Sequence, residues 1–162
     1  MLEVAGLIDQ TLKTVRVSRQ VLPSVRIYTT AHELGHAVLH PDASGVHRDR
    51  PLDGSSLSRE ASERQADKFA TIFLMPEKLV RSRFAEIFRS EQFVLNEETA
   101  FALAERTLSK MQNKCKTRRD ISRLLASVES YDGRRFLSLA AQFRVSVEAM
   151  AIRLEELSLL AA

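Results

Sequence analysis

The segment His32-Glu33-Leu34-Gly35-His36 has the residue types and spacing of a metal-dependent hydrolytic site. Residues four apart on an α-helix lie on one face, so the two imidazoles can bind one Zn²⁺ ion at about 2.0–2.1 Å. The carboxylate of Glu33 can then act as a general base toward water, as peptide hydrolysis requires. Because this five-residue pattern also arises by chance, the prediction depends on the rest of the sequence.

A catalytic zinc site of this kind needs a third protein ligand. One class of such enzymes supplies a histidine ten residues after the first, but Asp42 occupies that position here. His40 is two helical turns from His32, about 12 Å along a straight axis, which is too far for both to bind one ion. His47 lies in a segment over 41–57 that is rich in Pro, Asp, Gly and Ser and is typical of a surface loop. We expect this loop to form a rim over the site rather than to supply the ligand.

A glutamate on a separate helix is the remaining source of the third ligand. Glu63 and Asp67 are four residues apart and share one side of a helix predicted over residues 58–75. Glu63 can bind zinc, while Asp67 can accept a hydrogen bond from the outer nitrogen of a ligand histidine. If Glu63 is not the ligand, Glu60 is the next candidate. The alternative interpretation of Glu63 and Asp67 is that both are solvent-facing charges on a surface helix. Tyr28, His47 and Tyr131 are equal candidates for stabilising the oxyanion.

Hydrophobic periodicity predicts the elements that must position these residues. Alternating valine and isoleucine over residues 12–30 favours strands, the last of which, 25–28, leads directly into the helix that carries the histidines. Thr29 or Thr30 would cap that helix, and Thr30 with Glu33 fits a capping box. Pro41 should end the helix that carries the histidines. Further helices are predicted over residues 77–89, 97–111, 118–129, 134–143 and 146–160. Asn96 should cap the helix that starts at 97, and Ser146 should cap the last helix.

The predicted fold class is α+β. A small N-terminal β-sheet packs on a zincin-like helical core, and the C-terminal half is mostly helical. We expect a catalytic domain over residues 1–95 and a helical domain over 96–162, whose end at 134–160 is helix-turn-helix-like.

Length and composition limit the number of domains and the cellular location that the protein can have. The chain has 162 residues and a net charge of +3 at pH 7, which predicts one domain or a domain with a small appendage. No apolar run reaches 18 residues, and the N-terminus does not resemble a signal peptide. The single cysteine, Cys115, excludes an internal disulfide, and we expect an exposed thiol in a loop or at a helix end. These features favour a cytoplasmic location.

Two segments resemble the signature sequences of the ImmA/IrrE family of metallopeptidases: residues 25–40, VRIYTTAHELGHAVLH, and residues 63–76, ERQADKFATIFLMP. Residues 139–157 are also similar to that family. The resemblance implies a cytoplasmic protease that uses Zn²⁺, or Mn²⁺ in its place, and cleaves a helix-turn-helix repressor. Only 31 residues precede His32, fewer than is usual in the family, so we expect a short edge strand for pairing with substrate.

The C-terminal residues 136–157 also suggest a different class of function. They look like a helix-turn-helix, and seven Lys or Arg residues lie between 106 and 123, which together indicate a DNA-binding regulator. Glu148, near the start of the second helix, favours packing over DNA contact, and such a basic run is typical of a solvated helix face. A third interpretation is a metal-bearing pseudoenzyme that binds a repressor without cutting it.

Overall fold

The computed structural model describes residues 6–9, 14–41, 46–49, 61–104 and 107–161. The described chain is mostly helical with a small N-terminal sheet, which confirms the α+β prediction. It divides into two compact units, Met1–Leu74 and Met75–Ala162. The domain boundary predicted after residue 95 stays a prediction. No helix among the described residues combines the length and apolar character that crossing a membrane requires.

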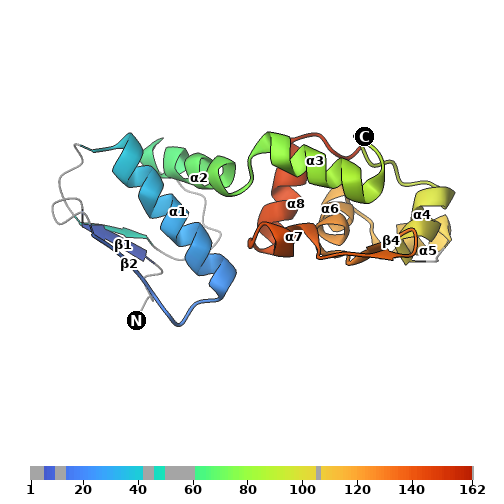
Figure 1. Cartoon of the computed structure of the whole chain (residues 1–162), viewed down its shortest axis with the longest axis horizontal. Coiled ribbons are helices and arrows are strands. Elements are labelled where there is room, and N and C mark those ends of the chain that lie inside the picture. Colours follow the sequence, from blue (N-terminus) through green and yellow to red (C-terminus); the bar gives the residue numbers. More distant parts are fainter. Residues whose placement is uncertain (1–5, 10–13, 42–45, 50–60, 105–106, 162) are drawn as a thin grey trace. The chain divides into compact units, whose positions relative to one another are not determined.

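The first unit combines a three-stranded antiparallel sheet with two helices (Figure 1). The strands are β1, Gly6–Asp9, β2, Thr14–Val17, and β3, Val46–Asp49, in the order β2-β1-β3. The helices are α1, Pro23–Leu39, and α2, Ala61–Leu74. Helix α1 contacts β1, β2 and α2, and it carries both histidines of the predicted site.

The strand predicted over residues 25–28 is wrong, because α1 already begins at Pro23. A proline in the first helical turn has a backbone angle suited to the helix and loses no hydrogen bond there. Thr29 and Thr30 therefore lie inside the helix and cannot be its N-caps. The Thr30 hydroxyl instead donates to the carbonyl oxygen of Arg26 at 2.8 Å, one turn back along the same helix.

The segment after α1 contains a strand where the sequence predicts an irregular loop. Helix α1 ends at Leu39, as the position of Pro41 predicts. Within the predicted loop 41–57, β3 pairs antiparallel with β1, which places His47 opposite Ile8 in the register. The rest of the loop, apart from Pro41, lies outside the described residues, as does Glu60, so the predicted rim and the fallback ligand stay predictions.

The second unit is built from six helices and a two-stranded hairpin among its described residues. The elements are α3 Glu77–Phe88, α4 Glu97–Ala104, α5 Leu108–Lys114, α6 Arg118–Ser127, β4 Ser130–Tyr131, β5 Arg134–Arg135, α7 Leu139–Gln142 and α8 Val147–Glu156. Large apolar side chains that are almost fully buried, among them Phe84, Leu125, Met150 and Leu154, form its core. Removing these side chains from water supplies most of the drive for this unit to fold.

Two predictions in this unit need correction. The helix expected over residues 97–111 is two helices, α4 and α5. The helix expected over 134–143 is also wrong at its start, because residues 130–135 form the β4–β5 hairpin. Its turn is Asp132-Gly133, with φ angles of 50° and 72°, a dipeptide that readily takes the left-handed conformation of tight hairpins. The predicted N-caps are confirmed: the Asn96 and Ser146 side chains accept backbone N–H bonds at the starts of α4 and α8.

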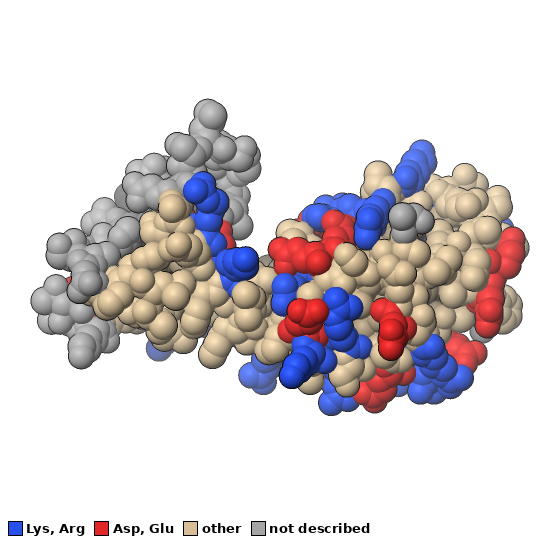
Figure 2. Space-filling model, turned by 90° about the horizontal axis from the view of Figure 1, so that it is seen from above, with Lys and Arg blue, Asp and Glu red and all other residues tan. Residues whose placement is uncertain are grey.

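Two basic residues of α6, Arg119 and Arg123, pair with acids of α8, although Arg123 is still half exposed, as the predicted solvated face requires. Arg119 bonds both carboxylate oxygens of Glu155 at 2.8 Å and one of Glu148 at 2.7 Å, and Arg123 bonds Glu148 at 2.6 Å. The hydrogen bonds from Arg119, together with one from Ser122, lower the pKa of Glu155 to about 2. On the face drawn in Figure 2, Lys and Arg of this unit are interspersed with Asp and Glu. Helix α8 is therefore held against α6 by charge as well as by apolar packing.

Candidate active site

The candidate site forms where α1 and α2 approach each other closely. Gly35 of α1 faces Ala66 of α2, and a Cβ atom added at Gly35 would lie 3.1 Å from the Ala66 Cα atom and 3.2 Å from its carbonyl oxygen. Ala66 and Ala70 are fully buried. Small residues on both helices therefore let the backbones come together, so that side chains on either side of the contact can converge.

Three side chains that could hold a metal ion converge beside this contact: His32 and His36 of α1 and Glu63 of α2. The two Nε2 atoms are 3.1 Å apart, and each lies 3.3 Å from a different carboxylate oxygen of Glu63, His32 from Oε2 and His36 from Oε1. In a tetrahedral site with bonds of about 2.0–2.1 Å, neighbouring ligand atoms are separated by about 3.3 Å. The donor set of two histidines and one glutamate, at these separations, therefore fits a divalent metal ion such as Zn²⁺.

Burial differs between the ligands in a way that suits a catalytic site. His32 and His36 are 3% and 2% exposed, so α1 holds them in a fixed environment. The Glu63 side chain is 27% exposed, so the cluster is accessible from the side of α2. A closed structural site would shield all its ligands, whereas a catalytic site keeps one position open to water or substrate.

Asp67 contacts the outer edge of the first histidine, as the sequence predicts for a supporting carboxylate. Its Oδ1 atom lies 2.9 Å from Nδ1 of His32. A carboxylate at this position favours the tautomer with the proton on Nδ1, which leaves the Nε2 lone pair directed toward His36 and Glu63. The pairs His32/His36 and Glu63/Asp67 thus face each other across the two helices.

Glu33 is buried on α1, with 1% of its surface exposed. Its competing interpretation, a capping box with Thr30, is excluded because α1 begins at Pro23 and both residues lie well inside the helix. A carboxylate is rarely buried without a polar or catalytic reason, since removing its charge from water is costly. In the sequence Glu33 directly follows His32, and its role as the general base stays a prediction.

The other candidates named from the sequence are His40, Tyr131 and His47. His40 is the C-cap of α1, and its ring centroid is 5.8 Å from that of His36, outside the ligand cluster. Tyr131 belongs to the second unit, where it is buried with its ring 5.2 Å from Phe88. The side chain of His47 lies outside the description. Sequence reasoning missed Gly35, although a glycine inside a helical pattern is itself a signal of close packing.

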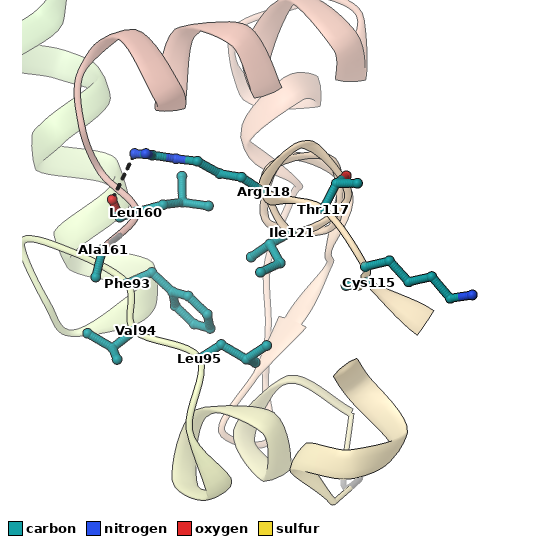
Figure 3. A pocket seen from close by; sticks show the side chains of 10 residues that line it. Phe93, Val94, Leu95, Cys115, Thr117, Arg118, Ile121, Leu160 and Ala161 are labelled. Atoms are coloured by element: carbon teal, nitrogen blue, oxygen red, sulfur yellow. Dashed lines mark hydrogen bonds between the residues drawn. The ribbon is translucent and has the colours of Figure 1, made fainter. Parts of the chain in front are cut away.

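A separate cavity in the second unit, of about 290 Å³, has a different character (Figure 3). Its described lining residues include no histidine, aspartate or glutamate that could activate a nucleophile or hold a metal. Cys115 lines it at the end of α5, but the thiol is buried, which corrects the expectation of an exposed cysteine. Burial raises the pKa of Cys115, which makes its thiol less reactive. On one side, the guanidinium of Arg118 donates to the carbonyl oxygen of Leu160 at 3.0 Å.

Comparison with known proteins agrees with the geometry of the first unit. A family model described as the IrrE N-terminal-like domain, Peptidase M78, matches residues 5–107, which include both site helices. No curated protein and no solved structure matched the chain. The family match covers more than half of the sequence and contains the HELGH segment together with Glu63 and Asp67. The chain therefore belongs to the ImmA/IrrE (Peptidase M78) family of zincin-like metallopeptidases.

Proposed function

We propose that this protein is a metal-dependent endopeptidase and that its substrate is a helix-turn-helix transcriptional repressor. The observation that carries the enzymatic part is the cluster of His32, His36 and Glu63, whose potential ligand atoms lie within 4.8 Å of one another, close enough to hold one metal ion. The repressor is supported by family membership alone, since such regulators are the typical substrates that the resemblance implies. Cleavage of the repressor would relieve repression of its target genes.

The roles of the residues follow from their positions. When bound, Zn²⁺ or Mn²⁺ supplies a Lewis acid that polarises the scissile carbonyl and makes water more acidic. His32, His36 and Glu63 hold the ion, and Asp67 holds the ring of His32 in the tautomer that binds it. Glu33 takes a proton from water and later delivers it to the leaving amine nitrogen, as a general base and then a general acid.

The test is cleavage of purified helix-turn-helix repressors by protein loaded with Zn²⁺ or Mn²⁺. Glu33→Gln keeps the size of the side chain but removes the base, so we expect the metal content to persist while the cleavage rate falls by about 10²–10⁴-fold. Glu91→Gln, at an exposed position of the second unit, is the matched control and should cleave at the wild-type rate. Cleavage by Glu33→Gln at the wild-type rate would refute the role of Glu33.

The helix-turn-helix-like end of the chain gives less support to the alternative of a DNA-binding regulator. Glu148 lies in the first turn of α8, where a recognition helix would approach DNA, and it pairs with Arg119 and Arg123. The cations that could contact phosphates are thus partly neutralised within the unit. Salt-dependent DNA binding by metal-free protein would favour the regulator over the protease.

A further inference from the structure

The hydroxyl of Tyr28 extends the line of polar contacts behind the candidate metal site. Tyr28 precedes His32 by four residues, so both side chains project from the same face of α1. The Tyr28 hydroxyl oxygen lies 3.4 Å from both Oδ1 and the carbonyl oxygen of Asp67, and its single proton can be donated to either or shared between them. The same Oδ1 atom lies 2.9 Å from Nδ1 of His32. One carboxylate oxygen therefore links the phenol to the imidazole.

From these contacts we infer that Tyr28 is a positioning residue, which holds Asp67 in the orientation that fixes the ring of His32. This inference rests on the proposed function, because it takes His32 to be a metal ligand. Without the phenol, the Asp67 carboxylate can rotate more freely about its side-chain bonds. The tautomer and tilt of the His32 ring would then be less well determined, and the ring would bind a metal ion less tightly.

The geometry also decides against Tyr28 as the group that stabilises the oxyanion. The two nitrogens of an imidazole lie on different sides of the ring. Nε2 of His32 points toward His36 and Glu63, whereas Tyr28 and Asp67 lie on the Nδ1 side. A group that stabilises the oxyanion must face the reacting carbonyl, on the metal side of the histidines. The phenol is instead engaged behind the first ligand.

The expected effect is modest because Tyr28 acts through another residue and its contacts are long. Loss of a carboxylate that directly supports a ligand histidine typically weakens metal binding by about 10–100-fold. The 3.4 Å contacts of Tyr28 are longer than the usual range of about 2.5–3.0 Å for an O–H···O bond and are therefore weak. We therefore expect Tyr28→Phe to weaken metal binding by about 3–10-fold, and Asp67→Asn to weaken it by about 10–100-fold.

The experiment measures the dissociation constant for Zn²⁺ by competition with a chromophoric chelator, in the full chain, without any assay of cleavage. Tyr131→Phe is the matched control, since it removes the other tyrosine hydroxyl of the chain, in the second unit. The deciding comparison adds Tyr28→Phe to Asp67→Asn. If Tyr28 acts through Asp67, the double variant should have a dissociation constant for Zn²⁺ within about twofold of that of Asp67→Asn alone, because the effects of coupled residues are not additive.

Each outcome separates the inference from the proposed function. If wild-type protein binds no Zn²⁺, the proposed function fails and the inference fails with it. If wild-type protein binds Zn²⁺ and Tyr28→Phe matches Tyr131→Phe, only the inference is overturned. An equal loss from Tyr28→Phe with and without Asp67→Asn would also overturn it, because a general loss of stability would act in both backgrounds.

Discussion

Replacing Gly35 by alanine should weaken metal binding without touching a ligand. The new Cβ atom would lie 3.1 Å from the Cα atom of Ala66, 3.2 Å from its carbonyl oxygen and 3.2 Å from Cδ1 of Phe69. Carbon atoms in contact prefer about 3.5–4.0 Å, and two of these neighbours are backbone atoms that cannot rotate away. The helices must therefore separate by about 0.4–0.9 Å, whereas metal–ligand distances tolerate about 0.2 Å.

Two opposite effects act on the stability of this variant. Alanine is a better helix former than glycine by about 1 kcal/mol. Overpacking a close contact costs about 1–3 kcal/mol, so the free energy of unfolding should fall by about 0–2 kcal/mol. The displacement of Glu63 from the two histidines should weaken Zn²⁺ binding by about 10–100-fold, equivalent to about 1.4–2.8 kcal/mol.

The assay combines Zn²⁺ titration with denaturant unfolding of the metal-free protein. Val38→Ala is the control, because it also raises the helix propensity of α1, at a position that is 57% exposed. It should leave Zn²⁺ binding unchanged. The reasoning would be refuted if Gly35→Ala bound Zn²⁺ within about twofold of wild type and unfolded at higher denaturant, as helix propensity alone requires.

Two further predictions concern the second unit. Because hydrogen bonds from Arg119 depress the pKa of Glu155 from 4.5 to about 2, its contribution to stability is present above pH 4.5 and lost as the pH falls toward 2. Glu155→Gln should therefore lower the free energy of unfolding by about 1–2 kcal/mol at pH 7 and make that free energy fall less steeply as the pH is lowered. Urea unfolding at a series of pH values measures both effects, and an unchanged dependence on pH would contradict this role of Glu155. Burial and a raised pKa should make Cys115 react with a disulfide reagent at least about tenfold more slowly in native than in denatured protein, and equal rates would contradict the buried position.

The convergence of the candidate metal ligands could be predicted because the spacing within each pair is local. His32 with His36, and Glu63 with Asp67, each need only a helix to bring them to one face, and helical spacing can be recognised within a few residues. The packing of the two helices against each other could be predicted from the small residue Ala66 and from the need of a zinc site for a third ligand. The contribution of Gly35 could be measured only once the two backbones were placed, because its neighbours lie 31 and 34 residues away in the chain.

The failures of prediction come from short windows and from long-range pairing. Residues 25–28 alternate like a strand, yet they continue a helical spacing that Pro23 initiates, and four residues cannot separate the two patterns. The strand at 46–49 depends on pairing with β1, about 40 residues earlier, for which no local pattern exists. The hairpin at Asp132-Gly133 is a different case, since its dipeptide is a strong local signal that the helical interpretation overlooked.

The three-ligand site is decided by comparing metal binding of the wild-type chain with that of Glu63→Gln. We predict one Zn²⁺ ion per wild-type chain, and a loss of affinity of at least about 100-fold when the carboxylate that bridges His32 and His36 becomes an amide. Glu91→Gln, exposed in the second unit, should bind like wild type. Wild-type protein that binds no Zn²⁺ or Mn²⁺, or Glu63→Gln protein that binds one ion as tightly as wild type, would contradict the three-ligand site.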